Sequence, residues 1–197
     1  MSEPIDWVQL DQEIRERNRQ DTISGTKIYS SSQARIGIEL IIGEDRLREA
    51  VDYYVAYRPE AELVRNVLWQ LRPWSAMQRC YEIYKNSTNI DDRIAAIELL
   101  RVVGDARALD WVKEFLADPN ESIQNCGVEF VDQLLFGGGI MQDEVALEKA
   151  KRLLEAAENH SSSFIREKAV SFQAGLAIRE ARTAQYDAYM AGLREPS

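Results

Sequence analysis

The sequence has few of the residues from which catalytic and metal sites are built. Its 197 residues include one histidine, His160, and two cysteines, Cys80 and Cys126. The cysteines form no C-x-x-C pair, so neither a disulfide framework nor a zinc site is indicated. We expect two buried free thiols, because free cysteine packs as a small hydrophobe, and we expect no metal and no cofactor.

Long apolar runs are also missing. No stretch approaches the roughly 18 apolar residues that a membrane span requires. The segment Met1-Ser2-Glu3-Pro4 lacks the basic and then apolar pattern of a secretion signal. These absences predict a cytoplasmic protein with no membrane partner.

The chain has no excess of basic residues. It contains 24 Lys and Arg against 33 Asp and Glu, which gives a formal net charge of −9. Binding to a phosphate backbone depends on clustered Lys and Arg that displace counterions. We therefore expect no nucleic-acid partner.

The most informative feature that is present is a repeated helix-turn-helix pattern between residues 91 and 135. A helix at 93–100 is followed by a turn at Gly104-Asp105 and a new helix start at 106–109. The next turn, Asp118-Pro119, leads into a second copy at 123–130. A helical pair that recurs at this interval indicates a repeat architecture.

This pattern resembles the HEAT repeat, in the short bacterial variety found in phycobilisome-lyase-like (E/Z) proteins. The family's motif runs G-D-x-x-A-L, then L-x-D-P, then V-R-x-x-A-A-x-x-L, and the resemblance covers roughly residues 31–180. It implies an all-α fold, an α-solenoid in which about five helix pairs form a right-handed superhelix. Such repeats build a binding surface and contain no chemistry of their own.

The first position of V-R-x-x-A-A-x-x-L serves as a register mark along the chain. The marks are Ala34, Val64, Asp92, Ile123 and Ile165. The next residue is arginine in four copies, namely Arg35, Arg65, Arg93 and Arg166. We expect these arginines to bind carboxylates or carbonyls within the array.

The later positions of the motif predict close helix packing. Small residues such as Cys126-Gly127 recur at the third and fourth positions, which favours the close approach of two helices. The seventh position is apolar in every copy: Ile41, Leu71, Leu99, Phe130 and Phe172. Gly137-Gly138-Gly139 interrupts a helix in the longest interval and predicts an inserted loop.

Amphipathic stripes predict the first helix of each pair. The stripes are Trp7, Val8, Leu10 and Ile14; Leu47, Ala50, Val51, Tyr54 and Tyr57; Trp74, Met77, Cys80, Tyr81 and Tyr84; Ala108, Leu109, Val112, Phe115 and Leu116; and Ala146, Leu147, Ala150, Leu153 and Leu154. We expect three segments: an N-terminal helix and polar loop at 1–30, with the loop covering 20–32; the array at 31–180; and a capping helix or frayed tail at 181–197.

The resemblance implies that the second helices of successive pairs line a concave face. Positions two, six and nine after each mark point away from the apolar stripe and form a polar, partly acidic ladder. The predicted partner-binding residues are Asn66, Gln70, Glu98, Arg101, Asn125, Glu129, Asp132 and Glu167, with Ser171 on the same ladder and Trp69 beside it.

The remaining chemical signals have structural interpretations. His160 precedes Ser161-Ser162-Ser163, and we interpret Ser161 or Ser162 as a helix N-cap rather than a nucleophile beside a base. The triple glycine is not followed by Lys-Ser or Lys-Thr, so a flexible loop is favoured over a phosphate cradle. No catalytic residue is predicted.

The aromatic residues divide into two groups. Tyr54, Trp74, Tyr81 and Tyr84 belong to core stripes. Trp69, Tyr53 and Trp111 lie off these stripes and are either interface anchors or packed against the adjoining pair.

The sequence therefore favours a non-enzymatic protein–protein interaction module, such as an adaptor, an assembly factor or an inhibitor-type scaffold. Its carboxylates would steer a protein partner with a basic patch onto the concave face. The resemblance also leaves an alternative, a bilin-lyase-like or chromophore-handling enzyme subunit, although no short motif carries that activity. Visible absorption of the protein expressed with a bilin distinguishes the two.

Overall fold

Helices account for every regular element in the part of the chain that the computed structural model describes, residues 5–23, 30–137, 140 and 143–192. No strand occurs in those residues, so the predicted all-α class is confirmed. The elements are α1 (Trp7–Ile23), α2 (Ser30–Ile42), α3 (Glu44–Val55), α4 (Ala61–Leu71), α5 (Trp74–Asn86), α6 (Ile90–Val103), the 3₁₀ helix η1 (Ala106–Trp111), α7 (Val112–Leu116), α8 (Glu121–Phe136), α9 (Glu144–Glu158) and α10 (Ser163–Gly192).

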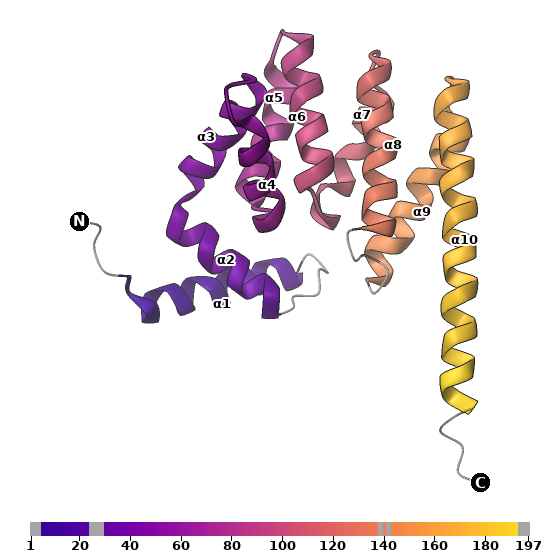
Figure 1. Ribbon diagram of the computed structural model, residues 1–197, viewed down its shortest axis with the longest axis horizontal. Coiled ribbons are helices and arrows are strands. Elements are labelled where there is room, and N and C mark those ends of the chain that lie inside the picture. The colour runs from indigo at the N-terminus through magenta and orange to yellow at the C-terminus, as the bar shows by residue number, and fades with distance from the viewer. Residues whose placement is uncertain (1–4, 24–29, 138–139, 141–142, 193–197) are drawn as a thin grey trace.

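Consecutive helices pack in pairs, and the second helices of neighbouring pairs are among those that contact each other. Within pairs, α1 contacts α2, α3 contacts α4, α5 contacts α6, α7 contacts α8, and α9 contacts α10. Between pairs, α4 contacts α6, α6 contacts α8, and α8 contacts α10. Figure 1 shows α6, α8 and α10 side by side, with α1 and α2 at one end of the molecule and α10 at the other.

Side-chain caps start the two helices of the clearest sequence repeat. The Asn89 side chain accepts a hydrogen bond from the Asp91 N–H at 3.0 Å, where α6 begins. At the start of α8, the Asn120 side chain accepts from the N–H groups of Ser122 at 2.9 Å and Ile123 at 3.3 Å. Asparagine at these positions satisfies backbone donors that have no partner within the helix.

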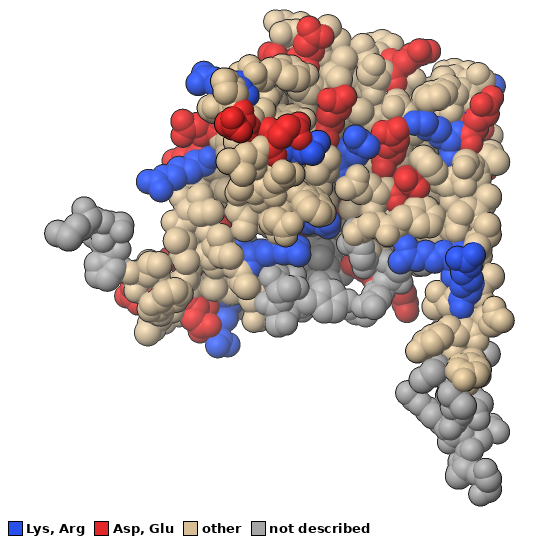
Figure 2. Space-filling view, in the orientation of Figure 1, with Lys and Arg blue, Asp and Glu red and all other residues tan. Residues whose placement is uncertain are grey.

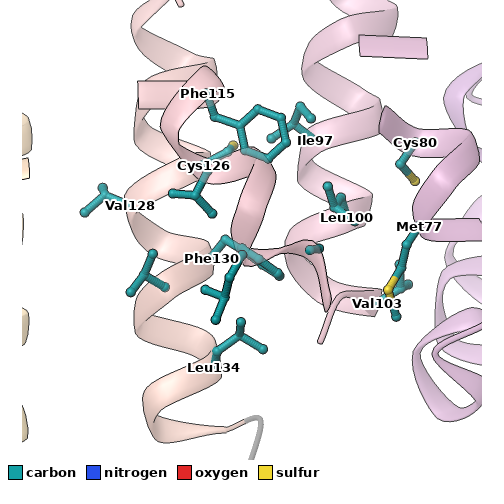
Figure 3. Close-up of a cluster of buried hydrophobic side chains, with 14 of the residues drawn as sticks. Met77, Cys80, Ile97, Leu100, Val103, Phe115, Cys126, Val128, Phe130 and Leu134 are labelled. Atoms are coloured by element: carbon teal, nitrogen blue, oxygen red, sulfur yellow. The ribbon is translucent and has the colours of Figure 1, made fainter. Parts of the chain in front are cut away.

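The core follows the predicted register most closely in the middle of the chain. Leu99 and Phe130, at the seventh motif position, are buried, and so are all five residues of the stripe from Ala108 to Leu116. Figure 3 shows Leu100, Phe115 and Phe130 in the layer where α6, α7 and α8 meet.

A glycine allows α7 and α8 to approach closely, as the small-residue positions predict. A Cβ atom added at Gly127 would lie 2.9 Å from Cβ of Phe115, which is closer than real side chains come. Gly104 has a similar role at the end of α6, where an added Cβ would lie 2.4 Å from Cε2 of Phe130. A larger residue at Gly127 would push α7 away from α8 within their pair, and one at Gly104 would push the end of α6 away from α8.

The prediction for α1 is wrong in part. Trp7 and Val8, assigned to its apolar face, are 67% and 71% exposed. The helix packs on α2 further along, where Ile14 lies against Gly37, so its first turn extends past the helix that was expected to cover it. Ile41, at a predicted core position of α2, is also exposed.

Two other expectations need correction. Residues 20–23 belong to α1 and 30–32 to α2, so the polar loop expected at 20–32 is shorter, and its centre, 24–29, lies outside the described residues. Tyr57, the last residue of a predicted core stripe, is exposed because α3 ends at Val55 and Tyr57 lies in the following turn with φ of 48°.

The last helix, α10, runs without interruption across residue 181, where a separate C-terminal segment was expected to begin. Residues 181–186 are all exposed, and Figure 1 shows this end of α10 projecting beyond the packed helices. The triple glycine falls partly outside the described residues, but α8 ends at Phe136, just before it.

Candidate functional site

The predicted binding residues lie on four helices that contact one another in sequence. We call them the polar face: Asn66, Trp69 and Gln70 on α4, Glu98 and Arg101 on α6, Asn125, Glu129 and Asp132 on α8, and Glu167 on α10. The α4 residues and Glu167 are exposed, and those on α6 and α8 are half-buried. Figure 2 shows acidic and basic side chains alternating over α6, α8 and α10.

At the centre of the polar face, the Glu129 carboxylate binds cations from two other helices. Arg101 of α6 contacts Glu129 Oε2 through Nη1 at 3.2 Å, and Lys168 of α10 forms an ion pair with Oε1. Lys168 Nζ also donates to Asn125 Oδ1 at 2.6 Å, and Asn125 Nδ2 donates to Glu129 at 3.3 Å. These contacts, which we call the Glu129 network, connect α6, α8 and α10.

Sequence reasoning missed Lys168. It occupies the third motif position, where other copies have small or apolar residues, and that departure was the one available signal. Its effect is substantial, because two cations balance a carboxylate that the acidic-ladder interpretation had treated as available to a partner. The ladder is therefore not uniformly negative.

The other two ladder acids differ from Glu129. Burial raises the pKa of Asp132, and Glu129 adds to the rise while Lys168 opposes it. Among the described residues, no Lys or Arg forms an ion pair with Glu98. Burial raises the pKa values of Tyr54 and Tyr57, and the Glu98 carboxylate contributes to both increases.

Helix α4 adds apolar surface to the polar face. Leu63 and Val67 are 61% and 47% exposed, and Trp69 is also exposed. Leu63 and Val67 are four residues apart, so they neighbour each other on one side of the helix. The sequence prediction did not include them, although this spacing was visible.

Trp111 packs against the adjoining pair instead of standing free. Its indole ring stacks on Trp74 of α5, with ring centroids 5.3 Å apart, and on Tyr81, at 4.4 Å. The predicted core assignments of Trp74, Tyr81 and Tyr84 are confirmed by their packing in or against the core. Tyr53 has a local role, since its hydroxyl donates to the carbonyl of Pro59 at 2.7 Å.

Polar groups beside this stack are satisfied within the chain. Tyr81 donates to Glu114 Oε1, and Lys85 contacts Oε2, both at 2.7 Å. The Lys85 ammonium, and then the Tyr81 hydroxyl, lower the pKa of Glu114. Burial is the main cause that raises the pKa values of Tyr81 and Tyr84 to about 12.

Three motif arginines bind groups within the array, as expected. Arg93 donates to the Tyr84 carbonyl at 3.0 Å and forms an ion pair with the buried Asp118. Arg166 donates to the carbonyls of His160 and Ser161 at 2.7 and 2.8 Å. Arg65 contacts Glu62 at 2.7 Å, whereas Arg35 is exposed.

Both ring nitrogens of His160 bind the backbone. Nε2 lies 2.8 Å from the Leu116 carbonyl oxygen, and Nδ1 accepts from the Ser162 N–H at 3.0 Å. With Nδ1 as acceptor, Nε2 carries the proton and donates. Ser162 directly precedes α10, in the position of an N-cap, and its own N–H donates to His160.

Both cysteines are free and buried, as expected. Burial raises the pKa of each thiol, and that of Cys126 to about 11. Nucleophilic cysteines need the opposite environment, one that lowers the pKa. Among the described residues, no cluster of three or more His, Cys, Asp or Glu side chains is arranged to hold a metal ion.

Two surface cavities lie away from the polar face. The larger, of about 760 Å³, separates η1 and α7 from α9, and two ion pairs border it: Lys149 with Asp110 at 2.5 Å, and Arg152 with Glu148 at 3.0 Å. The smaller, of about 390 Å³, lies between α3 and α5. None of the described helices is both long enough and apolar enough to cross a membrane.

Comparison with known proteins found no match to a family model, a curated protein or a solved structure.

Proposed function

We propose that this chain is a HEAT-like α-solenoid, a right-handed array of five helix pairs, and that it acts as a non-enzymatic protein-interaction module. Three features support the repeat assignment. Helices contact each other in pairs, the second helices contact in series, and Asn89 and Asn120 cap equivalent helices of the two clearest copies. Repeat arrays of this kind use extended surfaces to bind partners.

The observation that carries the proposal is the Glu129 network on the polar face. Arg101, Glu129 and Lys168 come from three successive second helices and hold one another in place. Side chains fixed in this way lose little conformational entropy when a partner binds. The polar face is thus a preorganised surface, as an adaptor, assembly factor or inhibitor-type scaffold requires.

The proposed partner is a protein with a basic patch, and neither nucleic acid nor a membrane takes part. A net charge of −9 favours the approach of a basic surface and opposes binding to phosphate backbones. Glu98 is a candidate acid for this role, because no Lys or Arg among the described residues pairs with it, whereas Glu129 is already neutralised by Arg101 and Lys168. Long-range attraction of this kind weakens as salt is added.

The test begins with cross-linking and co-purification of the tagged full chain, followed by isolation of the protein that it retains. Affinity for that protein is then measured at low and high salt for the wild type, Glu98→Lys and the control Glu155→Lys, an exposed acid on α9. We expect Glu98→Lys to weaken binding at low salt and Glu155→Lys to leave it unchanged. If the wild type and both variants bind with equal affinity at low and at high salt, the polar face is not part of the interface.

A chromophore-handling activity is the competing outcome. Expression with a bilin, followed by visible absorption of the purified protein, tests it directly. If the purified protein keeps its visible absorption, a chromophore-handling activity would take the place of the interaction-module proposal.

A further inference from the structure

Helix α10 stands at one end of the array, and its outer side is uncovered. The inner side, with the buried residues Ile165, Ala169 and Leu176, packs on α8 and α9. Figure 1 shows α10 at the edge of the molecule, with none of the described helices beyond it. In repeat proteins the terminal unit carries a polar outer side that keeps the array soluble. The outer side of α10 is instead apolar along much of its length.

The apolar residues on this side repeat with the spacing of a coiled coil. Steps of four and three residues alternate along a row that we call the α10 seam: Val170, Ala174, Ala177, Ala181 and Ala184. All of them are exposed, and with about 3.6 residues per turn they lie opposite the inner side. In the sequence, the same alternation continues to Ala188 and Ala191. Apolar residues with this spacing fit the contact of one helix with a second helix that runs alongside it.

Two opposite charges flank the α10 seam. Glu167 and Arg182 are exposed, and neither forms an ion pair with any residue that the structure describes. They are 15 residues apart in the chain and about 60° apart around the helix axis, so they lie on the same side of the seam, towards opposite ends of it. The other charged side chains described on α10 bind groups of their own chain: Arg166, Lys168, Arg179 and Glu180.

The order of these two charges favours one arrangement of two α10 helices. In an antiparallel pair, Glu167 of each copy lies close to Arg182 of the other, so both contacts are attractive. In a parallel pair, each of these residues would face the same residue of the second copy, and both contacts would be repulsive. The midpoint between Glu167 and Arg182 falls beside Ala174, within the seam. A two-fold axis at that place would therefore satisfy both charges at once, because a two-fold contact uses the same surface in both copies.

We infer that the outer side of α10 is a homodimer interface, in which the seams of two copies pack antiparallel around a two-fold axis. Val170 would pack against Ala181 of the second copy, and Ala174 against Ala177, since antiparallel heptads interlock in this way. The alanines allow the two helix axes to approach closely. Two Glu167–Arg182 ion pairs would flank the contact. A helix of another protein would need its own two charges in the reverse order, which a second copy supplies by symmetry.

Sedimentation velocity of the full chain tests the interface at concentrations from about 1 μM to about 1 mM, a range that covers weak to moderate dissociation constants. Ala177→Lys places a charge within the seam. The control, Ala156→Lys, changes another exposed alanine, on α9. Lysine is a good helix former, so both variants keep their helices, and thermal melts followed by circular dichroism verify the fold. We expect the wild type and the control to dimerise alike, and Ala177→Lys to dimerise at least about tenfold more weakly.

Charge reversal tests the antiparallel order. Glu167→Arg alone and Arg182→Glu alone each make both flanking contacts repulsive, so each should weaken dimerisation about tenfold at low salt. Added salt should reduce this loss, because it screens exposed charges. The double variant, Glu167→Arg with Arg182→Glu, exchanges the two charges and restores both attractions in the antiparallel pair. We expect it to dimerise within about twofold of the wild type, since exchanged ion pairs at the surface differ little in strength.

Three results would overturn the inference. A wild type that stays monomeric throughout the concentration range would show that the seam does not pair. Equal loss in Ala177→Lys and Ala156→Lys would place the dimer contact elsewhere. Failure of the exchanged double variant to recover dimerisation would contradict the antiparallel order. The inference goes beyond the proposed function and does not depend on it, so each of these results would leave the interaction module standing.

Discussion

The phenol ring of Tyr81 lies flat on the indole ring of Trp111, with centroids 4.4 Å apart and planes 9° apart. Tyr81 belongs to α5 and Trp111 to η1, so the stack joins two successive helix pairs. Trp74 also stacks on Trp111, and the Arg107 guanidinium lies 5.2 Å from the Trp74 ring centroid. Aromatic stacking adds free energy beyond the area that it buries.

Trp111→Ala should therefore lower the free energy of unfolding by about 3 kcal/mol, the low end for a large aromatic residue, since Trp111 is only half-buried. The measurement is urea denaturation followed by circular dichroism. The matched control is Trp69→Ala, where the exposed side chain should cost less than about 1 kcal/mol. Equal losses in the two variants would show that the stack adds no stability.

Phe130→Ala should lower the free energy of unfolding by about 3–5 kcal/mol, because a fully buried aromatic side chain would leave a cavity between α6, α7 and α8. The control is Phe136→Ala, at a residue that is exposed at the end of the same helix. A loss below about 0.5 kcal/mol in Phe130→Ala, the size of a typical surface effect, would contradict the motif register.

Glu129→Lys should destabilise the chain by about 2–4 kcal/mol, since it removes the shared carboxylate and places a third cation beside Arg101 and Lys168. Glu167→Lys, on the exposed part of the polar face, should change stability by less than about 0.5 kcal/mol. Chemical denaturation compares the two variants. Equal stability would mean that the Glu129 network does not hold the helices together.

Tyr81 and Tyr84 should ionise after the other tyrosines in an alkaline titration. Their folded pKa values of about 12 lie above the usual value of about 10. Because the unfolded chain loses these protons first, the stability that they contribute is fully present below pH of about 10 and declines as pH rises towards 12. Tyrosinate absorbance measures ionisation, and Tyr81→Phe should remove one late-titrating group. Ionisation of all eight tyrosines near the usual value, with the fold intact, would contradict this assignment.

Local sequence patterns predicted the middle of the molecule well. Helix periodicity is a property of neighbouring residues, so the burial of Leu99 and Phe130 could be read from their spacing. The same pattern failed at Trp7 and Val8, which are apolar and correctly spaced but are exposed. Whether an apolar face becomes core depends on its neighbours in space.

The candidate site was predictable only in outline. The motif register identified residues on α4, α6, α8 and α10, helices that do contact each other in series. It treated Glu98 and Glu129 as equivalent, although Glu129 binds Arg101 and Lys168 and Glu98 has no such ion pair among the described residues. The exposure of Leu63 and Val67 likewise became clear only once the packing of α4 was known.

The sequence by itself determined the helical class and the scarcity of histidine and cysteine, because periodicity and composition can be read from the chain without its neighbours in space. Only the tertiary structure decided which charges cancel and which apolar residues stay open. Lys168 and Glu129 are 39 residues apart in the chain, so their contact depends on how α8 and α10 pack. Packing of this kind is set by the shapes of many side chains acting together, and no short stretch of sequence contains it.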